Sequence, residues 1–230
     1  SGAQHADWMF ILVRTDPDAP KHEGISFVLF DMKTPGVSTR PIKLISGKSP
    51  FTETLFENVR VEKNQVVGEV NQGMRYMFTM MNDARLHVGL EGLGIAERAY
   101  QQAVDYAKER RQGRAIGTKP PETSPIIDHP DVRRMLMWMK AHVDGMRSFV
   151  YFGARLIDRI NCAATEADRA YHKGLLDLLT PVLKAYCTDR GFEVCSQAVQ
   201  VYGGYGYTRE YPVEQLMRDV RIASIYEGTN

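Results

Sequence analysis

Apolar residues recur at helical spacing along an unusually long stretch, from about residue 72 to residue 111. Met74, Met77, Phe78 and Met81, for example, lie at positions i, i+3, i+4 and i+7. A helix of this length would span roughly 60 Å at 1.5 Å per residue, which is long for a globular domain. This stretch constrains the fold more than any other part of the chain.

Helical periodicity continues after an interruption. Residues 113–127 are rich in Gly, Pro and Thr, and we expect a loop there. Pro130 suits the first turn of a second helix, which apolar spacing extends to about Ile157. A third helix is predicted over residues 166–201, with a kink or break at Pro181. Long amphipathic helices joined by short loops predict an antiparallel bundle.

The first 70 residues have a different pattern, typical of β-structure. We predict strands over residues 8–14, 25–30 and 54–61, because apolar and β-branched runs there are separated by turns rich in Pro and Gly. The connections are too short for crossover helices, so antiparallel pairing is expected.

Charge and cysteine content exclude several function classes. A formal net charge of +1 gives no long-range attraction to nucleic acid or to an anionic membrane. No apolar run approaches the ~18 residues of a membrane span. The three cysteines are too scattered for a disulfide framework and lack the paired spacing of zinc ligands, so we expect them to fill the helical core in a reducing compartment.

Two short segments carry the chemistry. Residues 200–207 read Gln-Val-Tyr-Gly-Gly-Tyr-Gly-Tyr, and glycines here would let a pyrophosphate approach exposed backbone N–H groups. The alternative is a helix cap followed by a turn, for which one glycine is enough. Residues 225–230 read Ile-Tyr-Glu-Gly-Thr-Asn, in which Glu227 would be a base if burial raised its pKa, or else an exposed loop glutamate.

Together, these segments and Arg-Asp-Val-Arg at residues 218–221 resemble the acyl-CoA dehydrogenase family. Phe-Glu-Asn-Val-Arg-Val at 56–61 and Gly-Ile-Ala-Glu-Arg-Ala at 94–99 resemble the family's closing β-domain strand and first bundle helix, so the similarity covers essentially the whole chain. Residues 113–136 resemble a bacterial subset that includes the 3-methylmercaptopropionyl-CoA dehydrogenase-like enzymes.

The resemblance implies an α+β fold, mainly α. Residues 1–70 would be the second half of a middle β-domain, and residues 71–230 an antiparallel four-helix bundle. The family's N-terminal domain and a flavin-contacting Trp-x-Thr segment have no match in this sequence. We therefore expect the chain to be a piece of a longer protein and to be inactive by itself.

The resemblance also implies a reaction: FAD-dependent α,β-dehydrogenation of an acyl-CoA thioester to a trans-2-enoyl-CoA. Glu227 would remove the pro-R α-proton while the β-hydrogen leaves as hydride to flavin N5. The N–H of Glu227 and a ribityl hydroxyl would stabilise the enolate. Some relatives carry the base just before the arginine matched by Arg85. Ala84 stands there in this chain, which leaves Glu227.

Further roles are carried over by position. Thr229 would contact the flavin diphosphate, whereas Arg110, Gln200, Gly203 and Gly204 would contact the FAD of a neighbouring subunit, which implies a homo-oligomer, either a dimer or a tetramer. The substrate-binding positions are Tyr226, Gly228, Arg85 and either Asn82 or Asp83.

The expected electron acceptor is an electron-transfer flavoprotein. One alternative is an acyl-CoA oxidase that uses oxygen, and another is a bundle that serves only assembly or ligand binding. The expected location is the cytoplasm, or the mitochondrial matrix if the source is eukaryotic. Acyl chain length is not encoded in any feature identified above.

Overall fold

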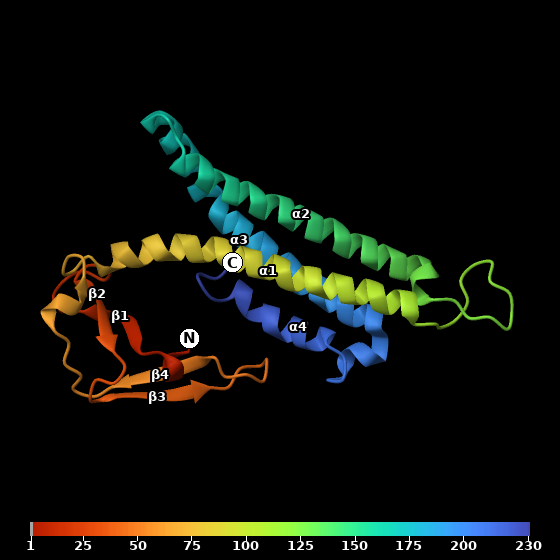
Figure 1. Ribbon diagram of the computed structural model, residues 1–230, viewed down its shortest axis with the longest axis horizontal. Helices are drawn as coiled ribbons and strands as arrows, with labels where there is room; N and C mark the ends of the chain where they lie inside the picture. Colours follow the sequence, from red (N-terminus) through yellow and green to blue (C-terminus); the bar gives the residue numbers. More distant parts are fainter. Residues whose placement is uncertain (1) are drawn as a thin grey trace. The chain divides into compact units, whose positions relative to one another are not determined.

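The computed structural model describes residues 2–230 (Figure 1). The chain divides into two compact units, Ser1–Met81 and Asn82–Asn230. A small antiparallel sheet region is followed by four helices, which confirms the predicted fold class, α+β and mainly α. In this described part of the chain, no helix is both long and apolar enough to cross a membrane.

Antiparallel strands make up most of the N-terminal unit. β1 (Trp8–Arg14), β2 (Ile25–Asp31) and β5 (Val66–Val67) form one sheet in the order β1-β2-β5. β3 (Val37–Ile42) and β4 (Phe51–Phe56) pair as a separate two-stranded sheet. The predicted strands at residues 8–14 and 25–30 are confirmed as β1 and β2.

The third predicted strand, at residues 54–61, is wrong over most of its length. β4 ends at Phe56, and the chain leaves the sheet at Asn58, whose φ of 53° is left-handed and incompatible with an extended strand. The apolar residues at positions 59 and 61 therefore imitate strand alternation without pairing. β3 was missed because Pro41 interrupts it, yet an edge strand tolerates proline.

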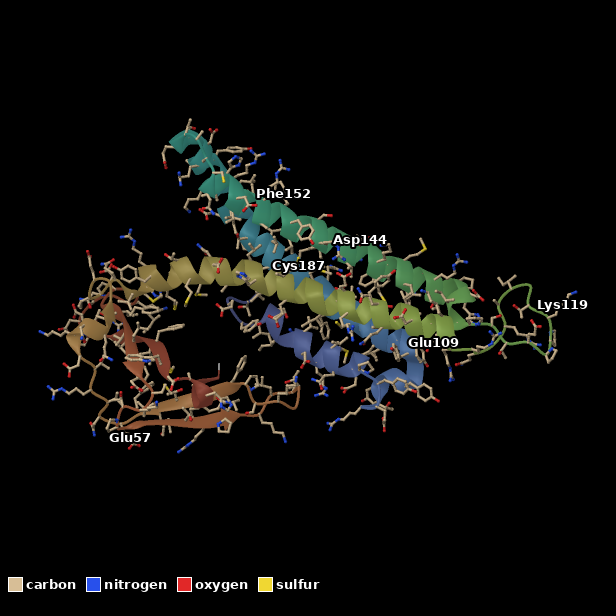
Figure 2. All side chains as sticks on the ribbon, in the orientation of Figure 1. Glu57, Glu109, Lys119, Asp144, Phe152 and Cys187 are labelled. Carbon is tan, nitrogen blue, oxygen red and sulfur yellow. The ribbon has the colours of Figure 1, made fainter. Side chains whose placement is uncertain are left out.

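The predicted helices are present with nearly the expected bounds. They are α1 (Gly73–Glu109), α2 (Pro130–Asn161) and α3 (Glu166–Tyr202), followed by the short α4 (Val213–Val220). Pro130 occupies the first turn of α2, as predicted. The segment between α1 and α2 is a loop that reaches Lys119 at its far end (Figure 2) and closes with a 3-10 turn at Ile126–Asp128.

Pro181 does not break α3. The helix continues through it to Tyr202, although Pro181 has no amide hydrogen to donate to the preceding turn. Just before it, the Thr180 hydroxyl donates to the Leu176 carbonyl at 2.7 Å. Because the helix is uninterrupted, residues far apart on α3 keep a fixed spacing.

Small residues let α1 and α3 cross closely. A Cβ added to Gly92 would lie 2.7 Å from the Cys187 carbonyl oxygen, and one added to Gly191 would lie 2.8 Å from the Gly92 carbonyl oxygen. Four alanines of α1 are fully buried: Ala96, Ala99, Ala103 and Ala107. Side chains on either glycine would push these helices apart.

Two of the three cysteines fill the core, as expected. Cys187 (Figure 2) and Cys195 are fully buried on α3, and burial raises the pKa of each thiol to about 12. These thiols therefore stay protonated and unreactive at neutral pH. The expectation is wrong for Cys162, which is exposed just after α2.

An ion pair joins α1 to α2. Arg147 Nη1 donates to Glu97 Oε2 at 2.6 Å, and the Arg147 and Glu97 side chains are 33% and 31% exposed. The hydrogen bond from Arg147 holds the pKa of Glu97 below its usual 4.5. Because the pair is partly solvated, we expect it to contribute only about 1 kcal/mol to the free energy of unfolding.

Glu97→Gln should therefore lower the free energy of unfolding by about 1 kcal/mol at pH 7. A carboxylate whose pKa is lowered by folding stabilises the protein above its unfolded pKa, and this stabilisation is lost as the pH falls through the folded pKa. The difference between wild type and variant should thus shrink toward zero by about pH 3 in urea unfolding. Glu57→Gln, at an exposed side chain of the N-terminal unit, serves as the control. A difference that persists at low pH would contradict the electrostatic cause.

Candidate active site

The terminal segment, residues 225–230, turns sharply after the 3-10 helix at Arg221–Ser224. The amides of Ile225 and Tyr226 both donate to the Ile222 carbonyl, at 2.8 and 3.2 Å. The chain then adopts left-handed backbone at Glu227, with φ of 55°, and at Gly228, with φ of 91°. Glycine adopts this conformation freely, whereas for glutamate it costs roughly 1 kcal/mol. Surrounding contacts must hold Glu227 in place.

Arg85, on α1, makes one of these contacts. Its Nε donates to the Glu227 carbonyl oxygen at 3.1 Å. A Cβ added to Gly228 would lie 3.1 Å from Arg85 Nη2. The guanidinium thus lies directly against the backbone of both residues, and the left-handed φ at position 228 favours glycine.

Tyr226 makes a second contact with α1. Its hydroxyl donates to a carboxylate oxygen of Glu91, and both side chains are half-buried. Burial, reinforced by the hydrogen bond to Glu91 and by its charge, raises the pKa of Tyr226 well above its usual range. Tyr226 therefore remains a neutral donor at physiological pH, fixed to α1.

The Glu227 side chain is left available. Within the described part of the chain, no group donates a hydrogen bond to its carboxylate, and its backbone N–H has no acceptor either. The side chain is half-buried rather than fully exposed. An unpaired carboxylate and an unpaired N–H on the same residue can act on one ligand, the first as a proton acceptor and the second as a hydrogen-bond donor.

The glycines at the end of α3 have different structural roles. Gly203 caps the helix with φ of 62°, and a Cβ on Gly206 would lie 2.4 Å from the Val199 carbonyl oxygen. Gly204 has neither constraint, because its φ is not left-handed and a Cβ there would have no neighbour within 4 Å among residues 2–230. The chain's own packing explains the other two glycines but leaves Gly204 unexplained.

Arg110 and Gly203 meet at one cavity of about 390 Å³, lined also by Tyr106, His129 and Tyr202. The Arg110 guanidinium carbon lies 5.2 Å from the centroid of the Tyr205 ring, which orients the cation toward the glycine loop. Tyr106 stacks on Tyr202 at 4.0 Å between centroids, and Tyr205 stacks on Tyr211 at 4.9 Å. A cation and open backbone at a rigid aromatic wall suit an anionic ligand.

The remaining predicted residues lie on the surface. Gln200 is exposed on the last turn of α3, and Thr229 is exposed within the terminal segment. Asn82 and Asp83 are both exposed on α1, and Asp83 is bonded to His87 through its backbone carbonyl. Asn82 precedes Arg85 by three residues and shares its helix face, whereas Asp83 does not. The structure thus favours Asn82 over Asp83 as the neighbour of Arg85.

Several residues near the site were not identified from the sequence: Glu91, Lys184, Thr188 and Asp189. Lys184 had a recognisable signal, because it interrupts the buried face of α3 that Leu183, Cys187 and Val194 define. A lysine at a core position is unusual and indicates a specific partner. Glu91 had no such signal, since nothing in the sequence relates it to a tyrosine 135 positions away.

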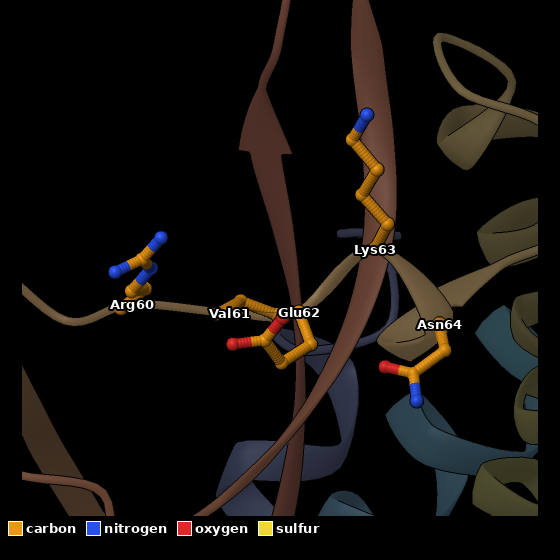
Figure 3. A pocket seen from close by; sticks show the side chains of 5 residues that line it. All are labelled: Arg60, Val61, Glu62, Lys63 and Asn64. Carbon is orange, nitrogen blue, oxygen red and sulfur yellow. The ribbon is translucent and has the colours of Figure 1, made fainter.

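The N-terminal unit has a hollow of its own, of about 440 Å³ (Figure 3). It is lined by consecutive residues of a single loop, Arg60–Asn64, and contains none of the predicted site residues. A hollow formed by one stretch of chain provides no opposing walls for a ligand.

Comparison with known proteins gives consistent relationships. Residues 71–230 match the family model described as acyl-CoA dehydrogenase, C-terminal domain. The chain is 39% identical over 232 residues to 3-methylmercaptopropionyl-CoA dehydrogenase of Ruegeria pomeroyi, which covers 95% of this chain and 39% of the relative. Butyryl-CoA dehydrogenase from Megasphaera elsdenii superposes with a TM-score of 0.80 at 29% identity, covering 99% of this chain and 54% of that one.

A chain from the structure of the electron transferring flavoprotein of Acidaminococcus fermentans superposes with a TM-score of 0.82 at 30% identity, covering 99% of this chain and 54% of that one. The sequence therefore spans about half, or less, of the length of the relatives that it matches.

Proposed function

The chain belongs to the acyl-CoA dehydrogenase family, and on that premise we propose that it supplies the catalytic base and part of the flavin site of an FAD-dependent acyl-CoA dehydrogenase. The proposed product is a trans-2-enoyl-CoA. The observation that carries the proposal is Glu227: a carboxylate without an internal partner, on a backbone held by Arg85 and Tyr226. Residues 1–70 are proposed as the second half of a middle β-domain and residues 71–230 as the bundle domain.

The proton transfer is assigned to Glu227. The α-proton of a thioester is only weakly acidic, so its removal requires a positioned base and stabilisation of the oxygen that gains charge. The Glu227 carboxylate takes the proton, and its unpaired N–H donates to the thioester carbonyl oxygen. Tyr226 and Gly228 are proposed to line the position of the thioester. Arg85, together with Asn82 or Asp83, is proposed to bind the rest of the substrate.

The cofactor contacts are assigned to the end of α3 and to Arg110. The cavity that Arg110 and Gly203 share, and the open space at Gly204, fit an anionic group that approaches the backbone closely. When bound, FAD would supply the hydride acceptor for the substrate β-hydrogen. Gln200 is proposed to contact the same FAD as Arg110 and Gly203. Thr229 is proposed to contact the diphosphate of the FAD in the site that contains Glu227 of its own chain.

Two chains are proposed to share each flavin. Arg110, Gln200, Gly203 and Gly204 would contact the cofactor of a neighbouring subunit, which requires a homo-oligomer with a two-fold interface, as a dimer or a tetramer. A monomer with bound flavin, observed by light scattering at micromolar concentration, would rule out the shared site.

The proposed electron acceptor is an electron-transfer flavoprotein, in keeping with the solved chain from the Acidaminococcus fermentans study. The full-length protein should be yellow and should lose its flavin absorbance when an acyl-CoA is added without oxygen. Reoxidation by the flavoprotein, and not by air, separates a dehydrogenase from an oxidase. A colourless protein that still assembles would instead favour a bundle without chemistry. The 230-residue chain alone should show no turnover, because part of the proposed flavin site lies outside it.

A further inference from the structure

Lys184 is a lysine in the protein core. It lies on α3, only 3% exposed, with fully buried Cys187 and Thr188 on the next turn. Removing an ammonium group from water is costly unless hydrogen bonds compensate for the lost hydration. Burial, together with repulsion from Arg85, lowers the pKa of Lys184, and attraction to Asp189 and Glu227 opposes this shift. Such a residue needs a specific role.

The partners of Lys184 lie in the terminal segment. Its ammonium donates to the Gly228 carbonyl oxygen and to Asn230 Oδ1, the latter at 2.9 Å. Arg85 binds the preceding carbonyl, that of Glu227, at 3.1 Å. Two cationic side chains from different helices therefore hold consecutive carbonyl oxygens, at the two residues whose backbone is left-handed.

Asn230 continues this network to α3. Its amide donates to Thr188 Oγ1 and to Asp189 Oδ1, each at 2.8 Å. Thr188 in turn donates to the Lys184 carbonyl at 2.9 Å. The residues after Glu227 are thus attached to α3, through Lys184 and Asn230. Tyr226, just before Glu227, is attached to α1 by its hydrogen bond to Glu91.

From this geometry we infer that Lys184 is a positioning residue for proton abstraction: it holds the Gly228 carbonyl so that Glu227 keeps the left-handed backbone that presents its carboxylate and N–H to the substrate. The inference rests on the proposed role of Glu227 as base. It assigns a function to a side chain that would not itself touch substrate or flavin.

Stability alone does not account for a buried lysine. Replacing buried charged groups, together with their partners, by apolar side chains of similar size is often neutral or stabilising for the fold. A methionine at position 184 would fill the same space without the desolvation cost, but it has no donor for the Gly228 carbonyl. The fold would then persist while Glu227 is free to relax to an ordinary backbone conformation, away from the productive geometry.

The test compares Lys184→Met with wild type in the full-length holoenzyme. The rate of flavin reduction by saturating acyl-CoA should fall about 100-fold, the loss expected for a displacement of about 1 Å, while KM and flavin content stay within about two-fold. With substrate deuterated at the α-carbon, the isotope effect on flavin reduction should increase, because proton removal becomes more rate-limiting. Fewer correctly folded molecules would lower the amplitude and leave the isotope effect unchanged.

Two further variants complete the test. Lys184→Gln keeps a neutral donor, so its rate of flavin reduction should lie between those of wild type and Lys184→Met. If Lys184→Met loses its flavin, Lys184→Gln is compared with wild type in its place. Lys173→Met, on the same helix but in an exposed pair with Asp177, should match wild type. If wild type is active and Lys184→Met reduces its flavin at the same rate, the inference is overturned. A wild type whose flavin is never reduced by any acyl-CoA would instead reject the proposed function.

Discussion

Replacing Glu227 by glutamine in the full-length protein should remove nearly all acyl-CoA dehydrogenation while flavin remains bound. Glutamine has almost the same shape as glutamate, and the Arg85 and Tyr226 contacts that hold this segment involve the Glu227 backbone and its neighbour rather than its carboxylate. The amide cannot accept the α-proton. Loss of a general base lowers rates by about 10² to 10⁴-fold.

Turnover with an artificial electron acceptor measures this loss, and the flavin spectrum reports retention of the cofactor. Glu210→Gln, at an exposed glutamate between α3 and α4, is the matched control and should behave as wild type. If Glu227→Gln kept more than about a tenth of wild-type turnover, another group would have to be the base.

Gly204→Leu should have the second large effect: loss of most bound flavin with the fold retained. No described residue lies within 4 Å of a Cβ at this position, and its backbone is not left-handed, so a side chain is harmless to the protein itself. It would occupy the space that we assign to the cofactor of a neighbouring subunit. Flavin content per chain and circular dichroism, measured on the same preparation, separate the two effects.

Gly174→Leu is the control for Gly204→Leu. Gly174 also has open space around it and lies exposed on α3, but at the opposite end of the helix from the glycine loop. Leucine there should leave flavin content unchanged and stabilise the helix slightly. Full flavin content in Gly204→Leu would mean that this glycine faces solvent and not a cofactor.

The helices were predictable because their signals are long and periodic. Apolar spacing locates both ends of α1 to within about two residues, and Pro130 marks the start of α2, which runs four residues past its predicted end. Short strands carry less information: Pro41 concealed β3, and the apolar residues after Phe56 imitated a strand that Asn58 ends. Pro181 shows the limit of local rules, since the packing of α3 against its neighbours outweighs one missing hydrogen bond.

The motif residues could be recognised, but not what holds them. Glu227 and Gly204 stand in patterns that point to chemistry. Arg85, Glu91 and Lys184 act on the terminal segment across separations of more than 40 positions, which no local pattern reveals. Arg85 and Glu91 lie on α1 and Lys184 on α3, and these two helices cross closely at Gly92 and Gly191.

The uninterrupted α3 has a consequence for mixed assemblies. It holds Lys184, which binds the Gly228 carbonyl oxygen of its own chain, and Gly204 follows its end, roughly 28 Å further along at 1.5 Å per residue. If two chains share each flavin as proposed, this helix would connect two different active sites. In a hybrid dimer of a Glu227→Gln chain and a Gly204→Leu chain, one site would contain both lesions and the other neither. Two inactive homodimers should therefore complement each other, and the hybrid should recover about half of the wild-type activity.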